Sequence, residues 1–126
     1  MAHVRVIAER YGLSDVFVAT DDPTVIDRLK EGEKAAGGTL RFVGVEKYRG
    51  LLRQLEESKD VWTEDRLRRG SVPAAPLLRS TVVDVMILSR ASAFVLHFAS
   101  NLSRLAYQLA VARTRKPPPY GKTSAP

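Results

Sequence analysis

Apolar residues in the first part of the chain alternate between helical spacing and short continuous runs. Over residues 2–11 an apolar side chain recurs at every third or fourth position, which predicts a helix that ends at Gly12. The run 15–19 is apolar and β-branched, so it predicts a buried strand. Asp22 is a favourable N-cap and Pro23 a favourable first helical residue, and we therefore expect a second helix from there.

The next residues complete a strand–helix–strand unit. Gly37 and Gly38 should end the second helix, and residues 39–45 follow as a second apolar run that predicts a strand. Strands joined through a helix pair in parallel, because the helical connection returns the chain to the same edge of the sheet. The pattern therefore predicts the α/β class, with a parallel sheet covered by helices.

The second half of the chain contains its most apolar stretch, residues 77–88. The β-branched residues in this stretch favour a strand, whereas its length favours a helix, and periodicity leaves the choice open. Residues 93–98 predict a third strand, and residues 101–112 predict a helix with one apolar face formed by Leu102, Leu105, Ala106 and Leu109. Between the two halves we expect a short helix around residues 51–55 and then a charged surface loop over residues 57–75.

The composition is that of one globular domain. The chain has 126 residues, of which 44% are hydrophobic and 27% charged, and domains commonly contain roughly 100–150 residues. There is no cysteine, which excludes disulfides, thiolate catalysis and cysteine-ligated zinc. No apolar run approaches the roughly 18 residues of a membrane span, and the first residues lack the apolar core of a secretory signal. We expect a folded domain over residues 1–112 and a flexible, basic, proline-rich tail over residues 113–126.

The formal net charge of +6 is unevenly distributed along the chain. Residues 113–126 carry +4, so the preceding 112 residues carry only +2. This tail and a cluster of Arg66, Arg68 and Arg69 leave one alternative open, a non-enzymatic basic α/β module that binds nucleic acid. No aromatic platform interleaves these charges, so nucleic acid is not the partner that we expect.

Two turns follow predicted strands and could hold a ligand. In an open parallel sheet, ligands bind beyond the carboxyl ends of the strands, where loops and helix N-termini meet. The turn before residue 102 suits a phosphate, because Ser100 and Asn101 offer side-chain donors beside the unpaired N–H groups of a helix start, and Arg104 adds a guanidinium. The structural alternative is that Ser100 only caps the helix and Arg104 is a solvated surface residue.

Three carboxylates are the other candidates for binding chemistry. Asp21 and Asp22 could accept hydrogen bonds from a sugar, a ribose or a base, or Asp22 could simply cap a helix while Asp21 lies on a turn. A metal-dependent sugar-nucleotide enzyme would need more carboxylates near this pair than the segment offers. Asp84 stands inside the apolar stretch, where an unpaired buried carboxylate is costly, so it faces solvent, pairs with Arg79 or contacts a bound partner.

Three segments, taken in order, resemble a known enzyme family. Residues 16–23, VFVATDDP, resemble the strand-and-turn motif of the α-1,6-fucosyltransferases, whose members fucosylate the core of N-glycans. Residues 83–91, VDVMILSRA, and the following segment 94–107 resemble the donor-binding region of the same family. The shared pattern there is an aspartate in an apolar helix, Leu-Ser-x-Ala, a short strand, a serine-rich turn and Arg-x-Ala-Tyr. The resemblance is loose over residues 14–45 and good over residues 79–109.

The resemblance implies a three-layer, Rossmann-like parallel sheet that forms the GDP-fucose-binding lobe of a two-domain GT-B glycosyltransferase. The implied donor-binding residues are Asp21, Asp22, Asp84, Ser100, Asn101 and Arg104. By position, the paired aspartates would contact the nucleotide, Asp84 the guanine or its supporting loop, and Ser100 with Asn101 the diphosphate. The family usually has glutamine after this serine, so Asn101 has a shorter reach. These enzymes are inverting and need no metal. The resemblance therefore implies no cofactor, and it implies GDP-fucose as the donor substrate.

The same resemblance implies a chain that is incomplete as an enzyme. The family's His-x-Arg-Arg-x-Asp segment, which supplies an arginine for the β-phosphate, lies upstream of the helix that starts this chain, and His3-Val4-Arg5 resembles it only superficially. The acceptor-binding lobe lies upstream too. We therefore expect a fucosyltransferase-type domain that binds its donor but is inactive alone, with a glycan acceptor held by a missing N-terminal lobe. The family implies the Golgi lumen, although this chain shows no signal or anchor.

Overall fold

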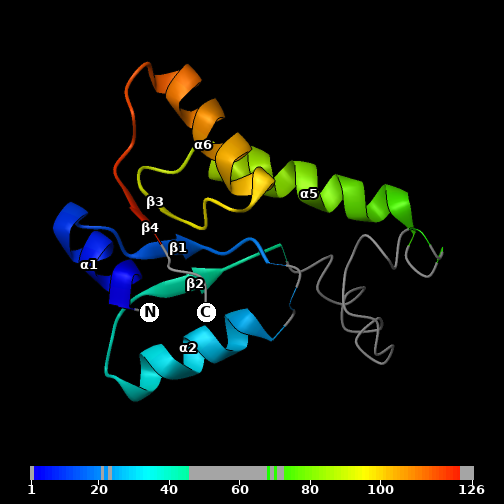
Figure 1. Ribbon diagram of the computed structural model, residues 1–126. Coiled ribbons are helices and arrows are strands. Elements are labelled where there is room, and N and C mark those ends of the chain that lie inside the picture. The colour runs from blue at the N-terminus through cyan, green and yellow to red at the C-terminus, as the bar shows by residue number, and fades with distance from the viewer. Residues whose placement is uncertain are drawn as a thin grey trace.

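The computed structural model describes residues 2–20, 22, 24–45, 68, 70 and 73–122. Within these residues the chain forms a small α/β fold of four helices and four short strands (Figure 1). In chain order they are α1 (Ala2–Tyr11), β1 (Asp15–Phe17), α2 (Val25–Ala35), β2 (Arg41–Val43), α5 (Ala74–Leu88), β3 (Phe94–Leu96), α6 (Asn101–Thr114) and β4 (Tyr120–Lys122). The predicted first helix, the three predicted strands and the helix from Asn101 are confirmed, although each strand is shorter than its apolar run.

The described strands form two separate parallel sheets of two strands each. Val16 of β1 lies opposite Phe42 of β2, and Val95 of β3 lies opposite Gly121 of β4. A helix joins the strands of each pair, α2 in the first and α6 in the second, so the chain contains two βαβ units. The predicted parallel pairing of β1 with β2 is confirmed. A single continuous sheet is not formed by these strands, because β1 and β3, each three residues long, are not hydrogen-bonded to one another.

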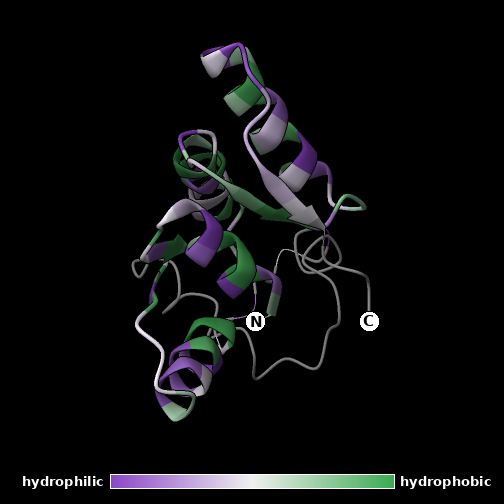
Figure 2. Ribbon diagram, turned by 90° about the vertical axis from the view of Figure 1, so that its left-hand side faces the viewer, coloured by the Kyte–Doolittle hydropathy of each residue, from purple (hydrophilic) through white to green (hydrophobic). Residues whose placement is uncertain are grey.

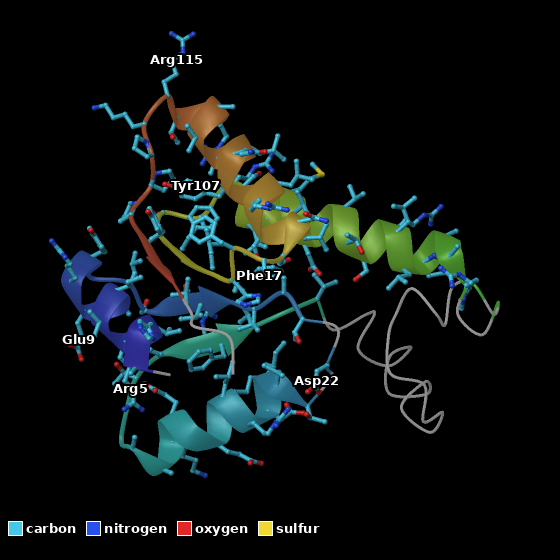
Figure 3. All side chains as sticks on the ribbon, viewed as in Figure 1. Arg5, Glu9, Phe17, Asp22, Tyr107 and Arg115 are labelled. Atoms are coloured by element: carbon cyan, nitrogen blue, oxygen red, sulfur yellow. The ribbon has the colours of Figure 1, made fainter. Side chains whose placement is uncertain are left out.

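The first unit, β1–α2–β2, has a small apolar core and a partly buried ion pair with α1. Ile26 of α2 and Phe42 of β2 are both fully buried. Glu33 on α2 is also buried, and its carboxylate accepts hydrogen bonds from Arg5 Nη2 (2.8 Å) and from the Leu40 N–H (3.1 Å). Figure 3 shows Arg5 reaching from α1 toward α2. The carboxylate therefore ties α1, α2 and the start of β2 together.

The second unit, β3–α6–β4, is held by an apolar cluster and by aromatic contacts. Phe94, Leu96, Ala106 and Ala110 form its buried core, with Leu88 of α5 packed against it. Tyr107 of α6 lies edge-on to Phe94, with ring centroids 5.4 Å apart, and edge-on to Tyr120 of β4 at 5.5 Å. Such T-shaped pairs add to the energy of apolar burial.

The prediction of a flexible tail from residue 113 is wrong for residues 113–122. α6 continues to Thr114, and the chain then returns so that β4 pairs with β3. The prolines prevent further helix but keep their carbonyl groups, and these accept hydrogen bonds from the second unit: the Pro118 carbonyl from the Tyr107 hydroxyl (3.1 Å) and the Pro119 carbonyl from the Phe94 N–H (2.9 Å). A proline-rich segment can therefore join a folded unit where only its carbonyl groups, and not its backbone nitrogens, take part in hydrogen bonds.

Three further predictions need correction or lie outside the described residues. The second helix begins at Val25, with Thr24 as its N-cap, and not at Pro23. The apolar stretch is helical, since α5 spans Ala74–Leu88 and thus takes over the end of the loop expected to reach residue 75. The short helix around residues 51–55 and most of that loop fall outside the described residues. None of the described helices is long and apolar enough to cross a membrane.

The expected apolar face of α6 is divided in the structure. Ala106 is fully buried, whereas Leu102, Leu105 and Leu109 are each more than two-fifths exposed. The reason is the close approach of α6 to β3 and α5, which admits the small side chains Ala106 and Ala110 and leaves the larger ones at its margin. Figure 2 shows hydrophilic and hydrophobic residues side by side along α6.

Candidate functional site

A crevice of about 1470 Å³ separates the two sheets. β1 and β3 line it from the strands, α5 forms its long wall, and Ser100 and Ser103 line it from the start of α6. Figures 1 and 3 show this arrangement: α5 and α6 lie on one side of the β1–β2 sheet, α2 lies on the other, and Phe17 is labelled on β1. The wall is largely apolar, and among the described residues that line it the only charged side chains are Asp15 and Asp84.

Asp84 contributes a carboxylate without a protein partner to this crevice. It lies on α5, is half-buried, and forms no hydrogen bond or ion pair within the part of the chain that the structure describes. Burial among apolar residues raises the pKa of Asp84 to about 6, because water no longer fully solvates the charged form. The suggested pair with Arg79 is not formed, since five residues along a helix place two side chains on different faces.

The start of α6 supplies hydrogen-bond donors at one end of the crevice. Ser100 is the N-cap, and its hydroxyl oxygen accepts from the Ser103 N–H (3.3 Å), so the expected capping role is confirmed. The N–H groups of Asn101 and Leu102 have no acceptor inside the helix, as at any helix start. Arg104 donates to the side-chain oxygen of Asn101, and both side chains are exposed and lie outside the crevice lining.

The first turn agrees with the structural alternative, in which Asp22 serves the start of a helix, and not with a free ligand-binding carboxylate at this position. Asp22 accepts hydrogen bonds from the Thr24 N–H (2.8 Å) and hydroxyl (2.6 Å) and from Arg28 Nη2 (2.7 Å). The bonds from Thr24, with a smaller contribution from the charge of Arg28, lower the pKa of Asp22. Its carboxylate is therefore used in starting α2, and Asp22 does not line the crevice. Asp21 falls outside the described residues.

Sequence reasoning missed several hydroxyl groups that line the crevice. Ser14 lies directly before β1, and Ser80 lies one helical turn before Asp84 on α5. The four-residue spacing of Ser80 and Asp84 was visible in the sequence, but it indicates a shared face only once residues 77–88 are known to be helical. Of the six predicted donor-binding residues, Asp84 and Ser100 line the same crevice.

The donor groups of the site suit an organic ligand. Among the described residues, no group of three or more His, Cys, Asp or Glu side chains is placed to hold a metal ion. The crevice offers apolar walls, hydroxyl groups, one unpartnered carboxylate and the N-terminus of a helix. No protein-family model, curated protein or solved structure that was compared with the chain matches it.

Proposed function

We propose that the crevice binds a nucleoside diphosphate sugar, with the base beside Asp84 and the diphosphate at the start of α6. The observation that carries this proposal is Asp84, a half-buried carboxylate without a described protein partner in an apolar crevice. In most folded proteins a carboxylate is either exposed to solvent or paired, because desolvating it without a partner is costly. A bound ligand that donates hydrogen bonds would offset that cost.

Guanine is the base that suits this carboxylate best. A carboxylate has two acceptor oxygens and no donor when it is ionised. Guanine presents two neighbouring N–H donors on its Watson–Crick edge, which match the two oxygens, whereas adenine and uracil alternate donors with acceptors there. Apolar residues of the same crevice, such as Phe17 and Leu88, would enclose the faces of the ring. The resemblance of residues 83–107 to the α-1,6-fucosyltransferases points to the same base and makes GDP-fucose the ligand that we propose.

The charges of the crevice set the orientation of this ligand. Asp84 brings an unpaired carboxylate to it, Asp15 is paired with Arg41, and no described cation lines it, so its interior offers no positive charge to a diphosphate. The start of α6 is the place where an anion is stabilised, by Ser100, by the unpaired N–H groups and by the helix dipole. Arg104, on the first turn, would reach the diphosphate after leaving Asn101.

For the reaction, we propose metal-independent, inverting transfer of fucose to a glycan acceptor in the Golgi lumen. The two βαβ units would then be the halves of a Rossmann-like GT-B lobe, with the crevice at their junction. An acceptor hydroxyl would attack the anomeric carbon and give its proton to a base on the acceptor lobe, while the bond to the diphosphate breaks and GDP leaves with the electron pair. Stabilisation of this leaving group by the start of α6 alone is modest, so an acceptor lobe with further cations completes the site.

Calorimetric titration of the whole chain with GDP tests the proposal. We expect binding with a dissociation constant between about 1 μM and about 1 mM, and no binding of ADP or UDP in that range. Asp84→Asn should weaken GDP binding at least tenfold, or roughly 1.4 kcal/mol, because the amide presents a donor to one guanine N–H. Glu9→Gln is the matched control, since Glu9 is exposed on α1 and points away from the molecule (Figure 3).

Two results would contradict this proposal. A folded protein that shows no heat with about 1 mM GDP has no nucleotide site of useful affinity. Equal affinity for GDP, ADP and UDP would show that the crevice binds the phosphates but that Asp84 does not recognise guanine.

A further inference from the structure

The outer surface of α6 carries large apolar residues that no described segment covers. Leu102, Leu105 and Leu109 recur at three- and four-residue spacing and are 47%, 44% and 43% exposed. We call these three residues the α6 stripe; Leu102 also lines the crevice, whereas Leu105 and Leu109 do not. Single exposed apolar residues are normal on a protein surface, but a repeat at helical spacing is typical of a helix that packs against another element.

α5 carries a second row of the same kind. Leu78, Val82 and Met86 follow one another at four-residue spacing and are 64%, 48% and 50% exposed. We call them the α5 stripe. It lies on the side of α5 away from Asp84, because four-residue steps drift slowly around a helix and Asp84 is offset by two residues from both Val82 and Met86. Leu78 also lines the crevice, whereas Val82 and Met86 do not, so the α5 stripe begins at the edge of the crevice wall and leads away from it.

The two helices that carry these stripes pack against each other. Leu88 of α5 contacts the cluster that contains Ala106 and Ala110 of α6, and Arg113 Nε donates to the Ser89 carbonyl (3.3 Å). In Figure 1, α6 crosses the C-terminal part of α5, and the N-terminal part of α5 extends past the strands. Rows at four-residue spacing form the ridges that fit into the grooves of another helix.

The charge around the stripes has one sign. Residues 73–122 contain seven basic side chains and one acidic side chain, Asp84, which lies in the crevice. Arg79 and Arg90 stand beside the two ends of the α5 stripe, and Arg104 and Arg113 beside the α6 stripe, all four of them exposed. None of these arginines forms a salt bridge with the residues that the structure describes.

We propose that the α5 and α6 stripes bind an amphipathic helix of another polypeptide, whose apolar face is bordered by acidic side chains. The α5 stripe is about 12 Å long, the rise of eight helical residues, so two to three turns of a partner helix would cover it. Acidic residues on both borders of the partner would pair with Arg79 and Arg90 and bring it to the surface. Burial of the leucines would then supply most of the affinity.

Neither nucleic acid nor a lipid surface accounts for both features. Nucleic acid would use the arginines but leave six apolar side chains without a function. A lipid surface would use both, but interfacial helices usually add aromatic side chains at the headgroup level, and the stripes consist of Leu, Val and Met. Apolar residues at helical spacing with arginines at their borders are best matched by a partner helix that has an apolar face and acidic borders.

Titration of the whole chain with a designed helical peptide tests this proposal. The probe is a peptide of about 18 residues with leucine on one face and glutamate on both borders, and its control carries lysine in place of glutamate. We expect micromolar binding of the glutamate peptide, with a dissociation constant of roughly 1–50 μM, and at least tenfold weaker binding of the lysine peptide. Raising the salt from about 0.05 M to about 0.5 M should weaken the binding severalfold without abolishing it.

Variants of the two stripes distinguish specific binding of the peptide from non-specific hydrophobic adsorption. Leu105→Gln with Leu109→Gln, and Val82→Gln with Met86→Gln, should each weaken the peptide at least tenfold and leave thermal unfolding unchanged, because these side chains are exposed. Gln108→Ala on α6 is the matched control and should bind normally.

Several outcomes would overturn the proposal. Equal binding of both peptides would remove the role of the arginines. A concentration-dependent dimer that the stripe variants abolish would assign the surface to a second copy, and loss of stability in these variants would show that the chain itself covers the stripes. Binding of phosphatidylserine vesicles or of a short RNA duplex, with no binding of the glutamate peptide, would assign it to a lipid surface or to nucleic acid.

Discussion

The two βαβ units of this protein share a topology and differ in how they use charge. Residues 2–45, which contain the first unit and α1, hold six basic and seven acidic side chains, and all three salt bridges found among the described residues lie there. Residues 73–122, which contain α5 and the second unit, hold seven basic side chains and a single acid. In the first region three ion pairs join charges within the fold, whereas in the second the arginines border exposed leucines and the acid faces a crevice.

The difference indicates where this protein meets other molecules. A surface whose charges are already paired offers little new energy to a partner, because forming a contact would first break an existing one. An unpartnered carboxylate in an apolar crevice, and arginines that form no salt bridge with described residues and lie beside apolar residues, gain energy on binding. We therefore expect substitutions in the first region to change mainly stability, and substitutions at selected positions of the second to change mainly binding.

The largest effect should come from the aromatic core of the second unit. Phe94→Ala removes a ring that is 3% exposed and that packs edge-on against Tyr107, and such truncations cost about 3–5 kcal/mol. Leu109→Ala on the same unit is the control and should cost less than about 0.5 kcal/mol. Chemical denaturation checks both values. A similar loss of unfolding free energy in the two variants would show that the α6 stripe is buried. It would contradict the distinction between the core and a binding surface.

The second largest effect is expected at Gly38, which lies against the carboxylate of Glu33 in the first unit. Gly38→Ala would place a Cβ atom 1.8 Å from Glu33 Oε1, so the carboxylate must move away from Arg5 and from the Leu40 N–H. We expect a loss of about 1–3 kcal/mol. Gly32→Ala is the matched control, because nothing lies within 4 Å of its Cβ and alanine favours a helix, so it should stabilise the protein. Unchanged denaturation of Gly38→Ala would contradict this account of the ion pair.

A smaller effect of opposite sign is expected at Asp84. Its folded pKa of about 6 lies above the ordinary value of 3.8, so the folded state binds the extra proton and wild-type stability falls as the pH rises from about 4 to about 6. Asp84→Asn should therefore be more stable than the wild type at about pH 7, by about 1–2 kcal/mol for a side chain that is partly hydrated, and equal to it near pH 4. Thermal unfolding at the two pH values checks this, and a variant that is less stable at pH 7 would show that Asp84 has a partner in the fold.

The smallest effect is expected at the outermost salt bridge of the first region. Arg41 and Asp15 are joined by two hydrogen bonds (2.7 and 2.9 Å) but both side chains are more than half exposed. Exposed pairs contribute little because water screens them. Arg41→Gln should therefore leave the unfolding temperature unchanged within error, unlike Glu33→Gln, which should lower it by several degrees. Equal losses would remove the distinction between buried and exposed pairs.

Local pattern predicted most elements of this fold, but it did not decide between helix and strand for residues 77–88 and did not predict β4. The helical spacing over 2–11, the apolar runs and Gly12, whose φ of +63° suits a helix end, predicted elements that the structure contains. The tail was misread because proline excludes helix and central strand, and the sequence does not reveal that Pro118 and Pro119 carbonyls complete the second unit. Which side of α6 is buried also depended on the closeness of its neighbours, which only the packing determines.

The candidate site was predictable to a similar extent. Asp84 was recognisable as a charge inside an apolar stretch, and Ser100 as a residue at a helix start, and both line the crevice. Asp22 has the same residue type as Asp84, but its oxygens are taken by Thr24 and Arg28. Whether a carboxylate remains available depends on neighbours that come together only on folding.

The measurement that tests the central claim most directly is the affinity for GDP-fucose at about pH 7.5 and about pH 5, in the wild type and in Asp84→Asn. The sugar nucleotide is preferable to GDP for this series, because a free terminal phosphate titrates near pH 6 itself. Ionised Asp84 accepts both guanine N–H groups, and its protonation below a pKa of about 6 removes one acceptor. The account predicts wild-type affinity that falls about tenfold toward the lower pH, and a variant that is weak at both. Wild-type affinity that does not change with pH, or a variant that binds as tightly as the wild type, would contradict it.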